Sequence, residues 1–291
     1  MKPGPFSYHD PTTVAEAVAL LGQFEDAKLL AGGQSLMPML NMRFVQPDHV
    51  VDLNGVDGID GIDDDGSRLT IGAMTRQARL MQHDAIAQRV PILREALTHV
   101  GHFQTRNRGT IGGSLCHLDP SAELPLMALL YDATLHVTGA EGAREIAMAD
   151  WPLAYMMPNI APDDVLHSVS MPYWTEAHGY GFEEMSRRHG DFAIVAVGCL
   201  LAVNGDRIER AAIALAGARD VPYRLSAAEA ALVGQPPTIE TFQAAAALAR
   251  AEDAMADAYV DKPYRQRLAG VLTQRALVKA AAPFGPGGTS S

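Results

Sequence analysis

Two glycine pairs, 80 positions apart, most constrain how this chain can fold: Gly32-Gly33 and Gly112-Gly113. Glycine permits a positive φ and lets the backbone come close to a ligand. Consecutive backbone N–H groups in such a turn form a concave site for an anion, usually a phosphate. The polar residues beside the two pairs are Gln34, Ser35, Thr110 and Ser114. Either pair alone is most often an ordinary turn, but the two together predict a site for a pyrophosphate.

Two acidic residues follow the second glycine pair. Asp119 and Glu123 lie four positions apart with Pro120 between them, so we expect a helix to begin at Pro120. A ribose needs acceptors for its hydroxyl groups, and an acidic side chain supplies them. Glu123 is the better candidate for that role, since Asp119 is also a suitable N-cap of the helix. The alternative for Glu123 is a first-turn acid that the helix dipole stabilises.

Several other kinds of site are excluded or disfavoured by missing motifs. The sequence contains no G-x-G-x-x-G, no G-K-[ST] and no G-x-S-x-G, which are typical of dinucleotide folds, phosphate loops and serine hydrolases. Cys116 and His117 lack further ligands at zinc spacing. With Cys199 as the only other cysteine, the chain cannot hold a four-cysteine iron–sulfur cluster alone, and no disulfide framework is indicated.

Length and charge narrow the class of protein. The chain has 291 residues, enough for about two domains. Its net charge is −11, which argues against nucleic acid or an anionic membrane surface as the main partner. No signal-peptide pattern opens the sequence, and the longest apolar run, residues 192–203, is shorter than the about 20 residues that span a bilayer. We therefore expect a cytoplasmic protein.

The N-terminal half predicts a small αβ unit and then helices. Thr13–Glu16 is a capping box that opens a helix. Residues 27–31 and 49–53 read as strands on either side of the first glycine pair. Residues 76–100 predict a pair of helices, the second opened by Pro91.

The C-terminal half predicts strands and then helices. Residues 178–193 are expected to join two domains. Residues 192–218 have the pattern of a hairpin around Asn204-Gly205. Ser226–Glu229 is a second capping box, followed by Ala-rich helices. The two further strands predicted before the joint are residues 133–139 and 163–172.

Four motifs together resemble the flavin-binding medium subunit of bacterial molybdenum hydroxylases, the carbon monoxide dehydrogenase and xanthine dehydrogenase family. The motifs are AGGQSLMPMLNMR (31–43), RNRGTIGGSLCHLDPSAELPLMALLYDA (106–133), FEEMSRRHGDFAIVAVG (182–198) and YRQRLAGVLTQRAL (264–277). Each is weak alone, but the four occur in the family's order and spacing. The resemblance runs from about Phe6 to Ala282.

The resemblance implies an α+β fold. FAD would bind between two N-terminal subdomains of the PCMH type, and a small α+β domain with an antiparallel sheet and helices would close over it. We expect the FAD-binding domain at residues 1–177, with subdomains of about 1–55 and 56–177. The C-terminal domain would span 178–283, and residues 284–291 would form a disordered tail.

The motifs also imply site residues. Glu123 matches the acidic residue that binds ribose, Leu166 a backbone contact to the flavin, and Asp191 a position near the isoalloxazine. One departure affects the flavin: Glu183 and Glu184 stand where some relatives carry a basic residue, and negative charge disfavours an anionic reduced flavin. The residues expected to hold the pyrophosphate are Ala31, Gly32, Gly33, Gln34, Ser35, Leu36, Thr110, Ile111, Gly112, Gly113 and Ser114.

The implied function is electron transfer. A large subunit would hold the molybdenum cofactor, a small subunit two [2Fe–2S] clusters, and this chain would pass their electrons through FAD to an external acceptor. The family suggests a dimer of heterotrimers, and overall similarity favours an N-heteroaromatic substrate over carbon monoxide. The arginines expected at flavin, acceptor or subunit contacts, or alternatively in surface ion pairs, are Arg106, Arg108, Arg187 and Arg188.

Two rival functions stay open from the sequence. A stand-alone FAD-dependent oxidase or dehydrogenase would need its own substrate pocket, and the residues after Asp191 look too few and too Ala-rich to build a substrate domain. A scaffold subunit that has lost FAD is disfavoured by the intact glycine pairs.

Overall fold

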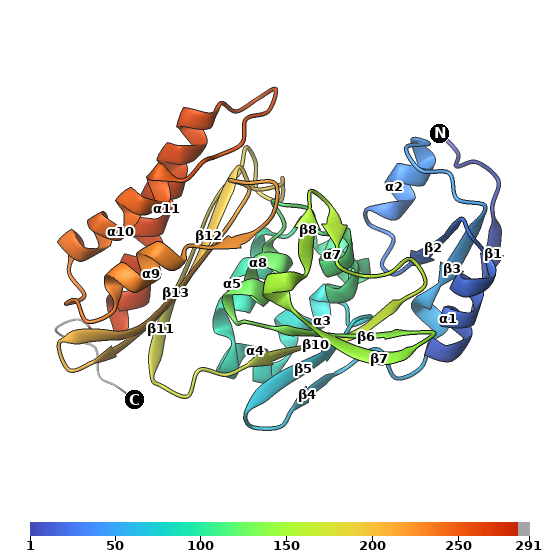
Figure 1. Ribbon diagram of the computed structural model, residues 1–291, viewed down its shortest axis with the longest axis horizontal. Coiled ribbons are helices and arrows are strands. Elements are labelled where there is room, and N and C mark those ends of the chain that lie inside the picture. The colour runs from blue at the N-terminus through green and yellow to red at the C-terminus, as the bar shows by residue number, and fades with distance from the viewer. Residues whose placement is uncertain (285–291) are drawn as a thin grey trace.

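The computed structural model of the protein describes residues 1–284, which form three bodies side by side along the long axis (Figure 1). The N-terminal body is a parallel sheet of order β1-β3-β2. Its helix α1 has the predicted capping box, with Thr13 and Glu16 bonding each other's backbone N–H groups. The elements of this body are β1 (Ser7–His9), α1 (Val14–Gln23), β2 (Ala27–Leu30), α2 (Leu36–Asn41), β3 (His49–Asp52) and the 3-10 turn Leu53–Gly55.

The central body is an antiparallel sheet of order β4-β5-β10-β6-β7 with helices packed on it (Figure 1). Its strands are β4 (Ile62–Asp64), β5 (Arg68–Gly72), β6 (Thr134–Gly139), β7 (Gly142–Ala147) and β10 (Val165–Pro172), with the small hairpin β8 (Pro152–Ala154) and β9 (Met157–Pro158) and the 3-10 turn Met148–Asp150. Its helices are α3 (Gln77–Gln82), α4 (Asp84–Arg89), α5 (Pro91–His99), α6 (Phe103–Arg108), α7 (Ile111–His117) and α8 (Glu123–Leu130).

The predicted helical pair at residues 76–100 is instead three helices. His83 and Val90 adopt non-helical backbone angles and separate α3, α4 and α5. Pro91 opens the last of them at its first turn, as predicted. The sequence pattern did not show the break at His83, because the apolar periodicity continues across it.

The C-terminal body is the antiparallel sheet β11-β12-β13-β14 with three helices on one face. The central helices α5 and α8 cover its other face (Figure 1). Burial on both faces explains the long apolar run of β12, because alternate side chains point toward different helical layers. The elements are β11 (His178–Met185), β12 (Val195–Asn204), β13 (Arg207–Ala216), β14 (Tyr223–Arg224), α9 (Ser226–Leu232), α10 (Ile239–Ala251), α11 (Lys262–Ala281) and the 3-10 turn Ala282–Phe284.

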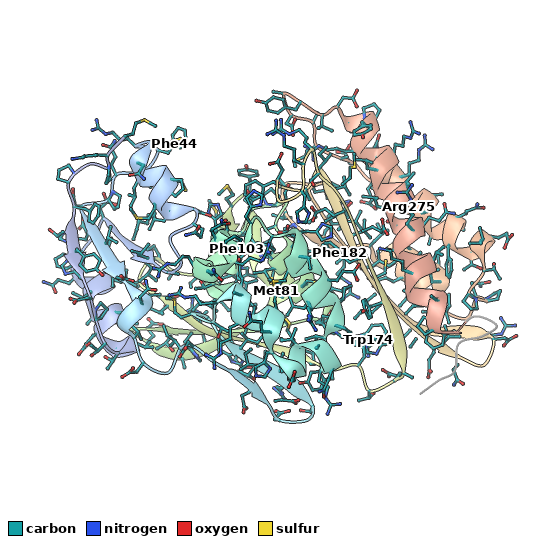
Figure 2. The ribbon with its side chains drawn as sticks, turned by 180° about the vertical axis from the view of Figure 1, so that it is seen from behind. Phe44, Met81, Phe103, Trp174, Phe182 and Arg275 are labelled. Carbon is teal, nitrogen blue, oxygen red and sulfur yellow. The ribbon has the colours of Figure 1, made fainter. Side chains whose placement is uncertain are left out.

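The expected joint at residues 178–193 is wrong for its first half, which is the edge strand β11. Phe182, 1% exposed, points toward the central helices (Figure 2). Gly181 on the opposite face lies against α11, where an added Cβ would be 2.1 Å from the Ala276 carbonyl oxygen. The glycines of this segment therefore serve close packing of a helix on a strand.

Two local predictions in this body need correction. The hairpin exists, but its two-residue loop is Gly205-Asp206, because Asn204 still pairs with Arg207. Ser226–Glu229 is not a capping box, since Ser226 is already helical and Leu225 is the N-cap. The predicted tail lies outside the described residues, apart from Phe284.

Candidate functional site

The two glycine segments lie against each other. A Cβ on Gly32 would be 2.3 Å from the carbonyl oxygen of Arg108 and 2.8 Å from the Cα of Gly109. The Cβ position of Gly113 is 3.5 Å from the Cβ of Ala31. The fold therefore brings together two segments that are 80 residues apart in the sequence, as a joint site requires.

The first segment is a turn between β2 and α2 with free backbone donors. Gly33 has a φ of 71°, which glycine adopts readily. The carbonyl of Gly33 accepts from the N–H of Met37. Within the described chain, the N–H groups of residues 32–35 donate no hydrogen bond. Adjacent unpaired N–H groups in a turn of this kind can bind the oxygens of a phosphate.

Two residues that the sequence analysis did not identify hold this turn in place. The side-chain amide of Asn54 donates to the carbonyl of Ala31 at 3.0 Å. The guanidinium of Arg76 donates to the carbonyl of Arg108 at 2.9 Å and also to the Asn54 side chain. Asn54 stands in a turn-rich segment and Arg76 at the start of a helix, and no local pattern marks either of them.

The second glycine pair is not a nest of free donors, which corrects that part of the prediction. Thr110 is the N-cap of α7, and its hydroxyl oxygen accepts from the N–H of Gly113 at 3.0 Å. The N–H groups of Ile111, Gly112 and Ser114 donate to carbonyls of Thr75, Ala73 and Thr110. Gly112 is needed because a Cβ there would lie 2.5 Å from the Cβ of Ala73. This segment contributes a tightly seated helix N-terminus beside the first turn.

The connection from α7 to α8 differs from the predicted helix start. Leu118 ends α7 with a φ of 50°, and α8 begins at Glu123 rather than at Pro120. The carboxylate of Asp119 accepts from the N–H of Ser121, so Asp119 caps a turn and not the helix.

Glu123 is the first residue of α8 and is 6% exposed. Burial, then the charge of Glu184, raises the pKa of Glu123 to about 8. An exposed acid at a helix N-terminus would not have a raised pKa. The alternative that Glu123 is only a first-turn acid stabilised by the helix dipole therefore explains its place in α8 but not its burial. A carboxyl group held from water without a protein cation is suited to accept hydroxyl groups of a ligand.

The remaining predicted residues lie on other elements. Leu166 is buried in β10 next to a bulge in its pairing with β6. The carbonyl oxygen of its neighbour His167 accepts a hydrogen bond from the N–H of Ala73. The carbonyl oxygen of Ala73 in turn accepts from the N–H of Gly112, so hydrogen bonds connect β10 to the start of α7. Asp191 lies in the loop after β11, 3.8 Å from Arg187.

The four candidate arginines differ in exposure and in their contacts. Arg106 donates to the carbonyls of Val100 and Gly101 and fixes the loop before α6. Arg187 pairs with Asp191 and lies over the ring of Tyr259. Arg187 is exposed despite these contacts, as are Arg108 and Arg188.

The donor set fits FAD. Free N–H groups after β2 suit a pyrophosphate, Gly32 lets that turn pack directly against the second glycine segment, and a buried carboxyl suits ribose hydroxyls. No group of three or more His, Cys, Asp or Glu side chains in residues 1–284 is arranged to hold a metal ion. None of the helices in this part of the chain is long and apolar enough to cross a membrane.

Comparison with known families and proteins gives matches over nearly the whole chain. The family described as "FAD binding domain in molybdopterin dehydrogenase" matches residues 4–174. The "CO dehydrogenase flavoprotein C-terminal domain" matches residues 180–280. The chain is 37% identical to the carbon monoxide dehydrogenase medium chain of Afipia carboxidovorans, covering 97% of this chain and 99% of the relative. It is 33% identical to the caffeine dehydrogenase subunit beta of Pseudomonas sp. strain CBB1, covering 97% and 96%.

Solved structures agree with these matches. Carbon monoxide dehydrogenase from Hydrogenophaga pseudoflava has a chain that superposes with a TM-score of 0.94 at 37% identity, covering 97% of this chain and 99% of that one. Quinoline 2-oxidoreductase from Pseudomonas putida 86 gives a TM-score of 0.93 at 35% identity with the same coverage.

Proposed function

Because this chain belongs to the family of FAD-binding medium subunits of molybdenum hydroxylases, we propose that it is the electron-transferring flavin subunit of such an enzyme. The family matches confirm the resemblance predicted from the four motifs, together with the α+β fold and FAD as the cofactor. The observation that carries the proposal is the turn at residues 32–35, with free N–H groups against the N-terminus of α7.

Different residues of the chain would bind different parts of the FAD molecule. The turn Ala31–Leu36 would bind the pyrophosphate. The segment Thr110–Ser114 would pack against this turn and hold it in place. Glu123 would accept the ribose hydroxyls, with Leu166 and Asp191 toward the flavin ring. Bound FAD would supply the electron carrier between iron–sulfur clusters of a partner subunit and an external acceptor.

We propose that the partners are a large molybdenum-cofactor subunit and a small iron–sulfur subunit, assembled as a dimer of heterotrimers in the cytoplasm. Several relatives are themselves called medium chains or subunits, and this chain covers 99% of the Afipia relative. That coverage favours a subunit over the stand-alone flavoenzyme. We also propose domain boundaries near 55 and 177, supported by the start of β11 at His178.

We assign the choice of substrate to the molybdenum subunit. Relatives of comparable identity to this chain have names as different as carbon monoxide dehydrogenase and caffeine dehydrogenase. A flavin subunit that is compatible with both does not itself select between them, so the expected preference for an N-heteroaromatic has no support from this chain.

The test is an absorbance spectrum and metal assay of the complex isolated from its native host, with its subunits resolved and its mass measured by sedimentation. We expect flavin bands with molybdenum and about four irons per copy of this chain, for two clusters. Flavin in a lone chain, without molybdenum or iron-bearing partners, would establish a self-contained flavoenzyme. Partners without flavin would establish a scaffold.

A further inference from the structure

The turn between β2 and α2, which faces α7 (Figure 1), has its consecutive carbonyl groups held by hydrogen bonds. The carbonyl oxygen of Ala31 accepts from the side-chain amide of Asn54 at 3.0 Å. That of Gly32 accepts from the side-chain amide of Gln34 at 3.1 Å, and that of Gly33 from a backbone N–H of α2 at 3.1 Å. In a trans peptide the N–H points away from the C=O. The three bonds therefore direct the N–H groups that follow these carbonyls to the opposite side, where they stay free.

Asn54 is the one residue from outside the turn that holds one of these carbonyls, and its own orientation is fixed. Its Nδ2 also donates to the carboxylate of Asp52, and its Oδ1 accepts from the guanidinium of Arg76. Asp52 is itself held by the Tyr8 hydroxyl, which donates to its second oxygen at 2.6 Å. An amide is required at position 54, because a carboxylate could not donate to Ala31 and a hydrocarbon could not accept from Arg76.

Arg76 connects Asn54 to the second glycine segment. Its guanidinium donates to the carbonyl oxygen of Arg108 at 2.9 Å, the same oxygen against which Gly32 packs. Both hydrogen-bond partners of the guanidinium in the described chain are neutral. A cation that donates to Asn54 polarises its amide and strengthens the bond to Ala31, and a peptide whose carbonyl is held in this way is a better N–H donor. The series of bonds thus runs from Arg76 through Asn54 to the N–H of Gly32.

We propose that Asn54 and Arg76 are positioning residues for the pyrophosphate of FAD, with Arg76 acting through Asn54 to orient the N–H of Gly32 for it. This inference rests on the proposed function, because it takes the turn at residues 32–35 as the pyrophosphate site. Without these bonds the Ala31 carbonyl is free to turn toward water, and binding must restore its orientation, which lowers the affinity. A ligand without phosphate does not need that orientation.

The experiment is a flavin fluorescence titration of the full chain freed of FAD, with ADP and adenosine as competitors. Asn54→Leu keeps the approximate shape of the side chain and removes its donors and acceptor. Its affinity for FAD and for ADP should fall by roughly 2- to 12-fold, the effect of one hydrogen bond. Its affinity for adenosine should stay within about twofold of the native value, because adenosine keeps the ribose but has no phosphate.

A double-mutant cycle tests whether Arg76 acts through Asn54. Arg76→Met should also weaken FAD and ADP binding, and the double variant should bind FAD about as weakly as Arg76→Met alone, because both changes break the same series of bonds. Arg79→Met is the matched control. It removes the same charge from the same helix, but Arg79 is exposed and pairs with exposed Asp60 at 3.3 Å, so FAD affinity should stay within about twofold.

Several outcomes would overturn the inference. Native affinity for FAD and ADP in Asn54→Leu would show that the amide does not position the donors. Equal losses for ADP and adenosine would show that the residue only supports the fold. Losses that multiply in the double variant, or an Arg79→Met chain as weak as Arg76→Met, would show that Arg76 acts independently of Asn54. A native chain that binds neither FAD nor ADP would instead overturn the proposed function itself.

Discussion

Gly32 packs against the backbone of Arg108 so closely that a Cβ at position 32 would be 2.3 Å from the Arg108 carbonyl oxygen. No side chain fits there without moving backbone. Gly32→Ala should therefore push the first glycine turn away from α7. Overpacking of this kind costs about 1–3 kcal/mol. If that cost falls on the conformation of the turn that binds FAD, the affinity for FAD should fall by roughly 5- to 150-fold, measured by fluorescence titration of the full chain.

Gly22→Ala is the matched control for this substitution. Gly22 lies near the end of α1 with no atom within 4 Å of the added Cβ and no positive φ. Alanine should be neutral or stabilising there by up to about 1 kcal/mol, because it favours the helix. Equal loss of FAD affinity in both variants would contradict the role given to Gly32.

The cap of α7 gives a second prediction. Thr110 is 2% exposed, and its hydroxyl oxygen accepts from the N–H of Gly113 at 3.0 Å. Thr110→Val keeps the shape but removes the acceptor, which should lower the free energy of unfolding by about 1 kcal/mol or somewhat more. Thr110→Ser keeps the hydroxyl and should retain most of the stability. Urea denaturation measures both, and equal stability of the two variants would show that the cap contributes little.

Parts of the candidate site could be predicted from the sequence where a short run of consecutive residues forms a recognisable motif. The two glycine segments, Glu123 and the capping box of α1 were all candidates of that kind. The structure brings the two segments together and contains the capping box, while the ribose contact of Glu123 stays a prediction. Asn54 and Arg76 could not be found, because each acts across the fold on a carbonyl of a distant loop. The paired N–H groups of α7 were also missed, since a glycine pair looks the same in a turn and in a helix N-terminus.

The fold shows the same limit. The apolar run of β12 and the hairpin were predictable from the local pattern, but β11 was not, and its segment was expected to join two domains. Gly179 and Gly181 are instead needed because α11 crosses the strand at short distance. A contact with a helix that begins about 80 residues later leaves no local signal.

A buried arginine supports the C-terminal body and gives a third prediction. Arg265 on α11 is 3% exposed. Its guanidinium donates to the carbonyl oxygens of Ile194 at 2.6 Å and of Gly217, and pairs with Asp257. Arg265→Met should cost about 3–5 kcal/mol, because the carbonyls and the carboxylate lose their partner. Urea denaturation should show this loss, whereas Arg267→Met, an exposed change two residues on, should stay within about 0.5 kcal/mol.

The last prediction concerns the pH dependence of stability. Burial raises the pKa of Glu123 from its ordinary value of 4.5 to about 8 in the folded chain. Between these two pH values the folded chain holds a proton that the unfolded chain has released, so stability must fall as pH rises from about 4.5 to about 8. Below that window both states are protonated, and above it both are ionised, so the contribution of this residue is constant outside it.

Glu123→Gln removes the titrating group while keeping the shape of the side chain. The variant without FAD should therefore lose less stability than the native chain between pH 5 and 8, and should be the more stable of the two at pH 8. The same change should weaken FAD binding, because a neutral amide accepts ribose hydroxyls less well than a carboxylate. Urea denaturation at several pH values and an FAD titration measure the two effects. A native chain whose stability does not decline toward pH 8 would show that Glu123 ionises without penalty, and that its burial is not what sets its proton affinity.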